Sequence, residues 1–406
     1  MGRKTRRKSP CRIPIMNTDE WISKGIKLAI SGNDQEALEA FNEALSIDPE
    51  SVIALSNKVV ALTRLGRNTD ALEACDKVLS IHPENEDIWN RKGIALMKLG
   101  RLNEALTAFD KATEISPKNS GIWSNKGHVL TRLGSDEKAL AAFDKAVTHD
   151  QSNAIAWVDK GVTLFKLGRV TEALKTYNRA IAINPNLASA WNNKGQVLDY
   201  LKKTNDALVA YDKALSIDQG LAVIWYNKGN ALVHANRDKD ALAAYDKAVA
   251  TDPDYIVGWY NKGNTLARLK RYPEAIDAYD HLLSIVPDYT DAWYNKGVAY
   301  SQLEEHENAK KAFNKALSLD PALPDAWCNI GEILVKQDRT DEAMSAFDTA
   351  LSIDPLFSLA WSSKADLFNK LQEFDKAFSC LEKFVRVQFE SLASLKVTGK
   401  KPQGRG

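Results

Sequence analysis

One polar position recurs along the chain at multiples of 34 residues, and it is mostly occupied by asparagine. Asparagine is not a strong helix former, so its return at a mid-helix position needs a reason. Its amide offers both a donor and an acceptor, which is what an extended polypeptide backbone requires. Helices about 10 Å apart and a peptide rise of about 3.3 Å per residue would give one asparagine to roughly three peptide residues. The asparagines are Asn57, Asn125, Asn193, Asn227, Asn261, Asn295 and Asn329.

Tyrosine directly precedes this asparagine in three consecutive repeats, as Tyr226, Tyr260 and Tyr294, and Asn230 and Asn264 lie one helical turn further along. Tyrosine supplies a large, rigid contact area with a polar tip, which is common at binding hot spots. We therefore predict that the seventh to ninth repeats carry the main binding surface. Two alternatives stay open: the asparagines bond a neighbouring helix or tolerate solvent, and the shared tyrosines reflect duplication of similar repeats.

The elements that position these side chains follow from the apolar residues, which keep the same period. Alanine follows each tryptophan position by sixteen residues in all eleven repeats, glycine follows it by four in nine, and an aromatic residue follows it by twenty in nine. Offsets of 0, 4 and 7 form one stripe of a first helix, and offsets of 16, 20 and 23 form one stripe of a second helix. Each repeat is therefore predicted to be a helical hairpin. All ten tryptophans mark the period, with Leu55 at the remaining position: Trp21, Trp89, Trp123, Trp157, Trp191, Trp225, Trp259, Trp293, Trp327 and Trp361.

Two residue types punctuate the hairpins. A Leu-Gly pair such as Leu99-Gly100 ends many first helices, and its glycine can take the left-handed conformation that turns the chain. Proline closes eight of the repeats and stops the second helix, as at Pro83.

This pattern of Trp, Leu-Gly, Ala, aromatic, Ala and Pro resembles the tetratricopeptide repeat over residues 18–391. The resemblance implies an all-α fold: an α-solenoid wound as a right-handed superhelix of eleven helix-turn-helix repeats around a concave groove. In some arrays of this family an inner asparagine ladder holds the backbone of a bound polypeptide. The resemblance carries that role to the seven asparagines as a hypothesis.

The chain departs from the family in having lysine just before the glycine position in ten repeats. Antiparallel packing within a hairpin predicts a ladder of Lys–Asp pairs, such as Lys126 with Asp144. The alternative is that the lysine stem covers apolar surface while the ammonium group stays in water.

Residue types that carry catalysis or bind metals lack the required spacing. The six histidines occupy unrelated positions in the repeat, and the four cysteines form no CxxC pair. No phosphate-binding loop, zinc-protease motif or nucleophile elbow is present. We therefore predict a protein that is not an enzyme and has no cofactor, metal or small-molecule substrate. The cysteine usage favours the cytoplasm, and no apolar run is long enough to span a membrane.

Charge separates the ends from the repeats. Residues 1–17 and 392–406 carry ten Lys and Arg and no acidic residue, which leaves 44 Lys and Arg against 53 Asp and Glu in between. We expect two basic, disordered tails, with Met16 as an alternative start of translation. The acidic repeats make nucleic acid an improbable partner except through the tails.

The last repeat carries an apolar face that no further repeat covers. Its residues are Phe378, Leu381, Phe384, Val385, Phe389 and Leu392. This face predicts either a longer capping helix or pairing with a second chain, that is, a homodimer through the C-terminal end.

These observations predict a scaffold or adaptor that binds a protein or an extended peptide in its groove. Two alternatives stay open: a targeting subunit of an enzyme complex, and an adaptor for nucleic acid or anionic surfaces that acts through the tails.

Overall fold

The computed structural model describes residues 16–398, which form helices and turns and contain no strand in that range. The first helix of each repeat has 13 residues, and the second has 14 except at the C-terminal end. The helices are α1 Thr18–Ile30, α2 Asp34–Ile47, α3 Val52–Arg64, α4 Asn68–Ile81, α5 Glu86–Lys98, α6 Leu102–Ile115, α7 Ser120–Arg132, α8 Asp136–His149, α9 Ala154–Lys166, α10 Val170–Ile183, α11 Ala188–Tyr200, α12 Thr204–Ile217, α13 Ala222–His234, α14 Asp238–Thr251, α15 Ile256–Arg268, α16 Tyr272–Ile285, α17 Thr290–Gln302, α18 His306–Leu319, α19 Pro324–Lys336, α20 Thr340–Ile353, α21 Ser358–Lys370 and α22 Phe374–Thr398.

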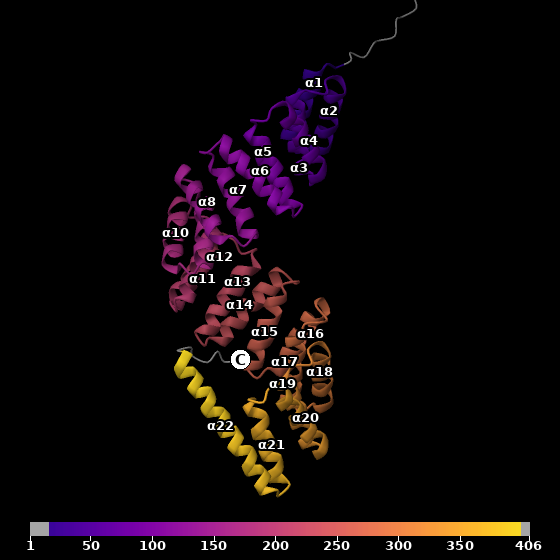
Figure 1. Ribbon diagram of the computed structural model, residues 1–406, viewed down its shortest axis with the longest axis vertical. Coiled ribbons are helices and arrows are strands. Elements are labelled where there is room, and N and C mark those ends of the chain that lie inside the picture. The colour runs from indigo at the N-terminus through magenta and orange to yellow at the C-terminus, as the bar shows by residue number, and fades with distance from the viewer. Residues whose placement is uncertain (1–15, 399–406) are drawn as a thin grey trace, which may run out of the picture. The chain divides into compact units, whose positions relative to one another are not determined.

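The hairpins group into two compact units, Met1–Leu198 and Asp199–Gly406, and the boundary falls within α11. Inside each unit the hairpins follow one another in chain order (Figure 1). The prediction of an all-α solenoid built from eleven helical hairpins is confirmed. The right-handed superhelix stays a prediction.

Glycine on the first helix lets the second helix approach closely. A Cβ atom added at Gly297 would lie 2.6 Å from Cε1 of Phe313, so only glycine leaves room for the ring. Both repeats that lack the glycine also lack the aromatic residue. Val59 stands with Cys75 in the second hairpin, and Ala365 stands with Leu381 in the last. The two positions therefore share one packing volume.

The turn inside each hairpin requires a left-handed residue, and the two units supply it differently. In the first unit the residue is a glycine in every case, as predicted, at Gly32, Gly66, Gly100, Gly134 and Gly168. In the second unit it is always another residue: Lys202, Asn236, Lys270, Glu304, Asp338 and Gln372. A side chain in this conformation costs about 1–2 kcal/mol, with asparagine the least penalised. The hairpin packing therefore imposes the turn even where the sequence opposes it.

A ladder of lysine–aspartate pairs joins the hairpins, but with a different partner from the predicted one. Lys126 lies 2.7 Å from Asp110 of the preceding hairpin, and Asp144 lies 2.7 Å from Lys160. The predicted pair of Lys126 with Asp144 is therefore wrong, because the lysine on a first helix faces the second helix that precedes it. The same step of sixteen residues pairs Lys92, Lys228, Lys262, Lys296 and Lys364 with Asp76, Asp212, Asp246, Asp280 and Asp348.

Several first helices of neighbouring hairpins contact one another directly within each unit. Such contacts join α1, α3, α5, α7 and α9 in the first unit, and α15, α17, α19 and α21 in the second. Among the contacts of this extent within residues 16–398, none joins two second helices. The first helices of these two sets therefore lie closer to one another than the second helices do.

The last helix is longer than the other second helices and runs to Thr398, beyond the predicted boundary at residue 391. Its face is largely open: Phe374 and Phe378 are 66% and 64% exposed, and Leu381 and Val385 are 40% and 47% exposed. Pairing of two chains through this face stays a prediction. The side chains of Phe389 and Leu392, and the parts of the basic tails at 1–15 and 399–406, lie outside the described residues.

Among the helices within residues 16–398, none combines the length and the apolar character needed to cross a membrane.

Candidate functional site

The predicted tyrosines and asparagines of the second unit are joined by hydrogen bonds between consecutive first helices. Asn295 on α17 donates from Nδ2 to the hydroxyl of Tyr260 on α15 at 3.1 Å. Asn329 on α19 donates in the same way to Tyr294 at 3.3 Å, and Asn261 donates to Tyr226 at 3.5 Å. Each bond spans 35 residues and links one hairpin to the next. The structure therefore brings these six residues into one row.

Asn261 and Asn329 also donate from Nδ2 to the carbonyl groups of Val257 and Asp325 in their own helices, at 2.9 and 2.8 Å. The amide nitrogen of the row is thus occupied. The amide oxygens of Asn261, Asn295 and Asn329 accept no hydrogen bond from any part of the chain that the structure describes. The three amide groups consequently use their N–H donors within the chain and leave their oxygen acceptors available.

Asn230 and Asn264, whose place on the binding surface stays a prediction, make hydrogen bonds to the core. Each accepts a hydrogen bond from the buried tyrosine on the second helix of its own hairpin. Tyr245 donates to Asn230 at 2.6 Å, and Tyr279 donates to Asn264 at 2.7 Å. Asn264 also receives a bond from Asn295 at 3.1 Å. These two asparagines are the hydrogen-bond acceptors of buried tyrosine hydroxyl groups. Through its bond with Asn295, Asn264 also links the core to the row.

Two further tyrosines, which the sequence reasoning missed, complete the surface. Tyr255 lies at the N-cap of α15 with its ring centroid 5.5 Å from that of Tyr226, in an edge-to-face arrangement. Tyr289 lies at the N-cap of α17, with a centroid distance of 5.4 Å to Tyr260. Both stand four residues before a tryptophan, which is the signal that could have identified them. We call Tyr226, Tyr255, Tyr260, Tyr289 and Tyr294 the tyrosine row.

Burial controls the ionisation of these hydroxyl groups. It raises the pKa of Tyr294 to about 12, and it also raises the pKa of Tyr255, Tyr260 and Tyr289 above the ordinary value. Tyr255, Tyr260, Tyr289 and Tyr294 therefore keep their hydroxyl proton at physiological pH and can both donate and accept hydrogen bonds.

The corresponding asparagines elsewhere do not extend this row. Asn57 donates to the carbonyl of Ile53 in its own helix at 2.8 Å, and Asn125 donates to Asn90 of the preceding hairpin at 2.9 Å. Asn193 accepts from the neighbouring Asn192 at 3.2 Å, and Asn227 is buried with 8% exposure. The seven asparagines therefore do not form one continuous ladder, and the tyrosine-linked set lies in the second unit.

The described residues hold no group of three or more side chains that could ligate a metal. Burial raises the pKa of Cys75 and Cys328 to about 12, so these thiols stay protonated and unreactive near neutral pH.

Models of the tetratricopeptide repeat match residues 120–153, 188–221, 222–255, 244–277, 290–323 and 324–355, and a model described as TPR repeat matches residues 161–199 and 263–304. A model of the N-terminal TPR repeats region of Psidin matches residues 29–133. Among curated proteins, none matches the sequence of this chain.

Solved structures of repeat proteins resemble the chain. A tetratricopeptide repeat protein from Parabacteroides merdae is 18% identical, with a TM-score of 0.51 over 61% of this chain and 98% of that one. YrrB, described as a TPR protein with an unusual peptide-binding site, is 26% identical, with a TM-score of 0.40 over 44% of this chain and 93% of that one. MamA from Desulfovibrio magneticus is 23% identical, with a TM-score of 0.40 over 41% and 95%.

The repeat models together match most of the chain between residues 29 and 355. The matches that start at residues 120, 188, 222, 290 and 324 are separated by multiples of 34 residues, the period that the tryptophans mark. The helical hairpins, the residues that pack them and the matches to the repeat models all indicate the same repeated unit. Proteins built from such repeats serve in general as scaffolds for protein–protein interaction. The chain belongs to the tetratricopeptide repeat family.

Proposed function

We propose that this protein is a non-enzymatic scaffold that binds an extended polypeptide along α13, α15, α17 and α19. The observation that carries the proposal is the row of hydrogen bonds from Asn261, Asn295 and Asn329 to the tyrosines of the preceding hairpins. The cytoplasmic location that the cysteine usage predicts is part of the same proposal.

The bonding supports recognition of a peptide backbone. Each asparagine has its amide nitrogen fixed by a tyrosine hydroxyl, so the amide oxygen points in a defined direction before any partner arrives. An extended peptide presents backbone N–H groups that need acceptors. Because the acceptors are already oriented, little conformational entropy is lost on binding.

The aromatic rings supply the apolar part of the surface. The tyrosines of the row are partly buried, so their rings are held firmly while one side stays open. Side chains of the peptide would pack between neighbouring rings, and rigid tyrosines of this kind frequently carry most of the energy of an interface.

Acidic residues set a charge preference. Asp291 lies close enough to influence Tyr260 and Tyr289 electrostatically, and Asp325 does the same for Tyr294. A partner segment with lysine or arginine would complement these carboxylates, whereas an acidic segment would be repelled. We therefore propose a neutral or basic peptide as the partner.

The test is selection of peptides from a random display library on the full chain, followed by affinity measurement with labelled peptides. Replacing Tyr226, Tyr260 and Tyr294 together by Ala should weaken the selected peptides by at least about tenfold, since a hot-spot side chain contributes about 2 kcal/mol or more. Tyr260→Phe keeps the ring and removes one of the two hydrogen-bond partners of Asn295, so it separates the contribution of the hydroxyl from that of the ring.

Asn57→Ala is the control, because Asn57 occupies the same repeat position as Asn261 but makes no hydrogen bond to a tyrosine within the described residues. It should leave the affinity unchanged. Selected peptides that bind the triple tyrosine variant as tightly as the wild type would show that the binding surface lies elsewhere.

The alternative of a targeting subunit remains a prediction, and recovery of one stoichiometric catalytic partner would support it. An adaptor that acts through the basic tails remains a prediction as well.

A further inference from the structure

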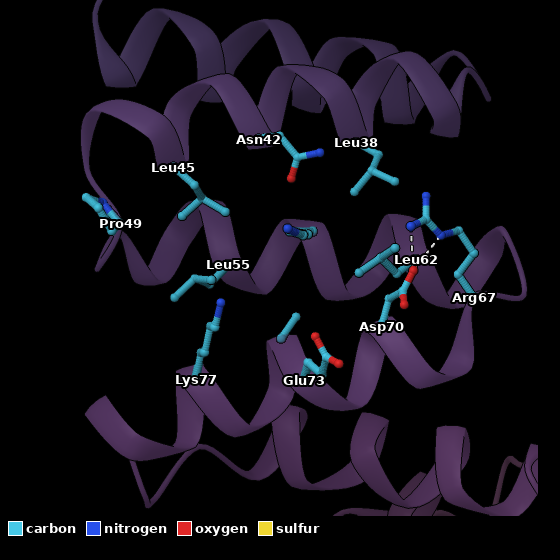
Figure 2. Close-up of a pocket in the computed structure, with 12 residues that line it drawn as sticks. Leu38, Asn42, Leu45, Pro49, Leu55, Leu62, Arg67, Asp70, Glu73 and Lys77 are labelled. Atoms are coloured by element: carbon cyan, nitrogen blue, oxygen red, sulfur yellow. Dashed lines mark hydrogen bonds and ion pairs between the residues drawn. The ribbon is translucent and has the colours of Figure 1, made fainter.

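The second hairpin has leucine where the other hairpins have tryptophan. A cavity of about 370 Å³ lies beside this residue, Leu55, between α2, α3 and α4. Figure 2 shows Leu38, Leu45 and Leu62 around this cavity together with Leu55, so part of its wall is apolar. The volume lies within the range of sites that hold small ligands or single large side chains.

The cavity includes a backbone acceptor that normally serves an indole. From Trp89 to Trp361, each of nine tryptophans donates from Nε1 to the carbonyl group six residues earlier, at 2.8–3.4 Å. Pro49 is the residue six positions before Leu55, and it lines the cavity. Leucine has no N–H group in its side chain, so the carbonyl group of Pro49 lacks this donor.

Two lysines flank the same space. Around Trp123, the ammonium groups of Lys126 and Lys145 lie 4.7 and 4.5 Å from the ring centroid, so the ring receives two cations. The residues at the equivalent positions of the second hairpin are Lys58 and Lys77, and both line the cavity. They occupy the same repeat positions as the two lysines around Trp123, but the second hairpin has no aromatic ring at the position of Leu55.

Lys58 also lacks the acidic partner that its counterparts have. The residue sixteen positions earlier is Asn42, where most hairpins have the aspartate of the ladder. No carboxylate within the described part of the chain lies at ion-pair distance from Lys58. Burial, with Lys77 and Arg67 nearby, lowers the pKa of Lys58. Of the two acidic residues in the cavity wall, Asp70 is paired with Arg67 at 2.5 Å.

A hollow of about 450 Å³ in the eighth hairpin shows that volume alone does not distinguish the cavity. There the ring of Trp259 stacks on His281 with centroids 4.0 Å apart, and Lys262 lies 2.8 Å from Asp246. In the eighth hairpin the carbonyl group of Pro253 therefore has its indole donor, and Lys262 has its carboxylate partner. In the second hairpin the carbonyl group of Pro49 has no indole donor, and Lys58 has no carboxylate partner within the described residues.

We propose that the cavity beside Leu55 binds an indole ring from another molecule, with an acidic group next to the ring. The indole N–H would donate to the carbonyl group of Pro49, Lys58 and Lys77 would flank the ring, and the acidic group would pair with Lys58. The ring would come from a tryptophan beside an aspartate or glutamate in a polypeptide, or from a free indole carboxylic acid. This site lies in the first unit and is independent of the tyrosine row.

The experiment uses 5-fluoroindole-3-propionate as the probe and observes its ¹⁹F NMR signal in the presence of the full chain. We expect saturable binding with a dissociation constant on the order of 1 mM, which is ordinary for a ligand of this size. Leu55→Trp supplies the protein's own indole to the carbonyl group of Pro49 and to the two lysines, and it should weaken the probe at least about tenfold.

Asn42→Asp gives Lys58 an internal partner. It should weaken the acidic probe by about threefold to fivefold and leave 5-fluoroindole, which has no acidic group, unchanged. Asn178→Asp is the matched control, because it adds the same charge at the same repeat position next to Lys194, in a repeat that has its own tryptophan. It should leave both probes unchanged.

A short peptide with Trp-Asp at its centre, compared with the same peptide carrying Ala-Asp, identifies the source of the ring. Stronger competition by the Trp-Asp peptide than by indole-3-propionate supports a polypeptide partner, and the reverse supports a free indole acid. Absence of saturable binding up to about 10 mM, or equal binding by wild type and Leu55→Trp, would overturn the proposal.

Discussion

The ammonium group of Lys126 pairs with Asp110 of the preceding hairpin at 2.7 Å, and it lies at the same time 4.7 Å from the ring centroid of Trp123. One side chain thus joins two neighbouring hairpins. Since the Asp110 side chain is 47% exposed, solvent screens the pair. A double-mutant cycle of Lys126→Met and Asp110→Asn should give a coupling of about 0.5–1 kcal/mol that falls with added salt. Hydrogen exchange of α6 and α7 measures it locally. A coupling that salt does not change would contradict the ion-pair interpretation.

Replacing Glu304 by Gly should stabilise the protein. Glu304 has a φ of 59°, where a side chain is strained and glycine is not. The expected gain is about 1 kcal/mol, less what glycine costs in the unfolded chain, or about 1–2 °C in melting temperature. Asn236→Gly, at the same repeat position with a φ of 55°, should gain less because asparagine tolerates this conformation. Equal gains, or a loss for Glu304→Gly, would show that these turns are not strained.

Replacing Gly297 by Ala should destabilise the ninth hairpin. The new Cβ atom would lie 2.6 Å from Phe313, and relieving this contact costs about 1–3 kcal/mol. Adding Phe313→Leu reproduces the Ala365 and Leu381 combination of the last hairpin. The double variant should be more stable than the sum of the single effects predicts, and thermal unfolding of the three variants checks this. Simple additivity would show that the two positions do not share one volume.

The stability of the first unit should depend on pH through His128. Its Nε2 lies 3.2 Å from a carboxylate oxygen of Asp159 of the next hairpin, and this close contact raises the pKa of His128 above its ordinary value of 6.5. Since the folded protein holds the proton more tightly, the stabilisation is complete below the ordinary value and is lost as the pH rises through the raised pKa.

The measurement compares melting temperatures of wild type and His128→Gln from about pH 5 to about pH 9. The difference should be largest at the acidic end and fade towards the alkaline end. The effect should not exceed about 0.5 kcal/mol, because the side chain is 44% exposed. Asp159→Asn should remove the same pH dependence. A difference that grows with pH would contradict the assignment.

The helices could be predicted from the sequence because the signals are local. Stripes such as Trp259, Gly263 and Leu266 identify one helix without any knowledge of its neighbours. The left-handed turns at Lys202 and Gln372 could not be predicted in this way, because packing between the two helices imposes the backbone there. The partner of Lys126 was wrong for a similar reason, since spacing does not say which adjacent helix a side chain faces.

The candidate site, too, could be predicted only in part from the sequence. The period identified Tyr260 and Asn295 as members of one surface, but it did not show that they bond each other. It also placed Asn264 on the binding surface, which stays a prediction, but it did not show that the Asn264 oxygen accepts from the buried Tyr279. Hydrogen-bond partners depend on how adjacent hairpins are rotated, and a single repeat sequence does not contain that rotation.

Contacts inside each unit join helices that are one or two places apart in the chain. Short separations of this kind make loop closure inexpensive and folding fast. At ordinary rates of synthesis a ribosome adds a further hairpin every few seconds, roughly 2–7 s for 34 residues. Each hairpin can therefore dock on its predecessor before the next one emerges, and assembly can proceed from the N-terminal hairpins while the later ones are still being translated.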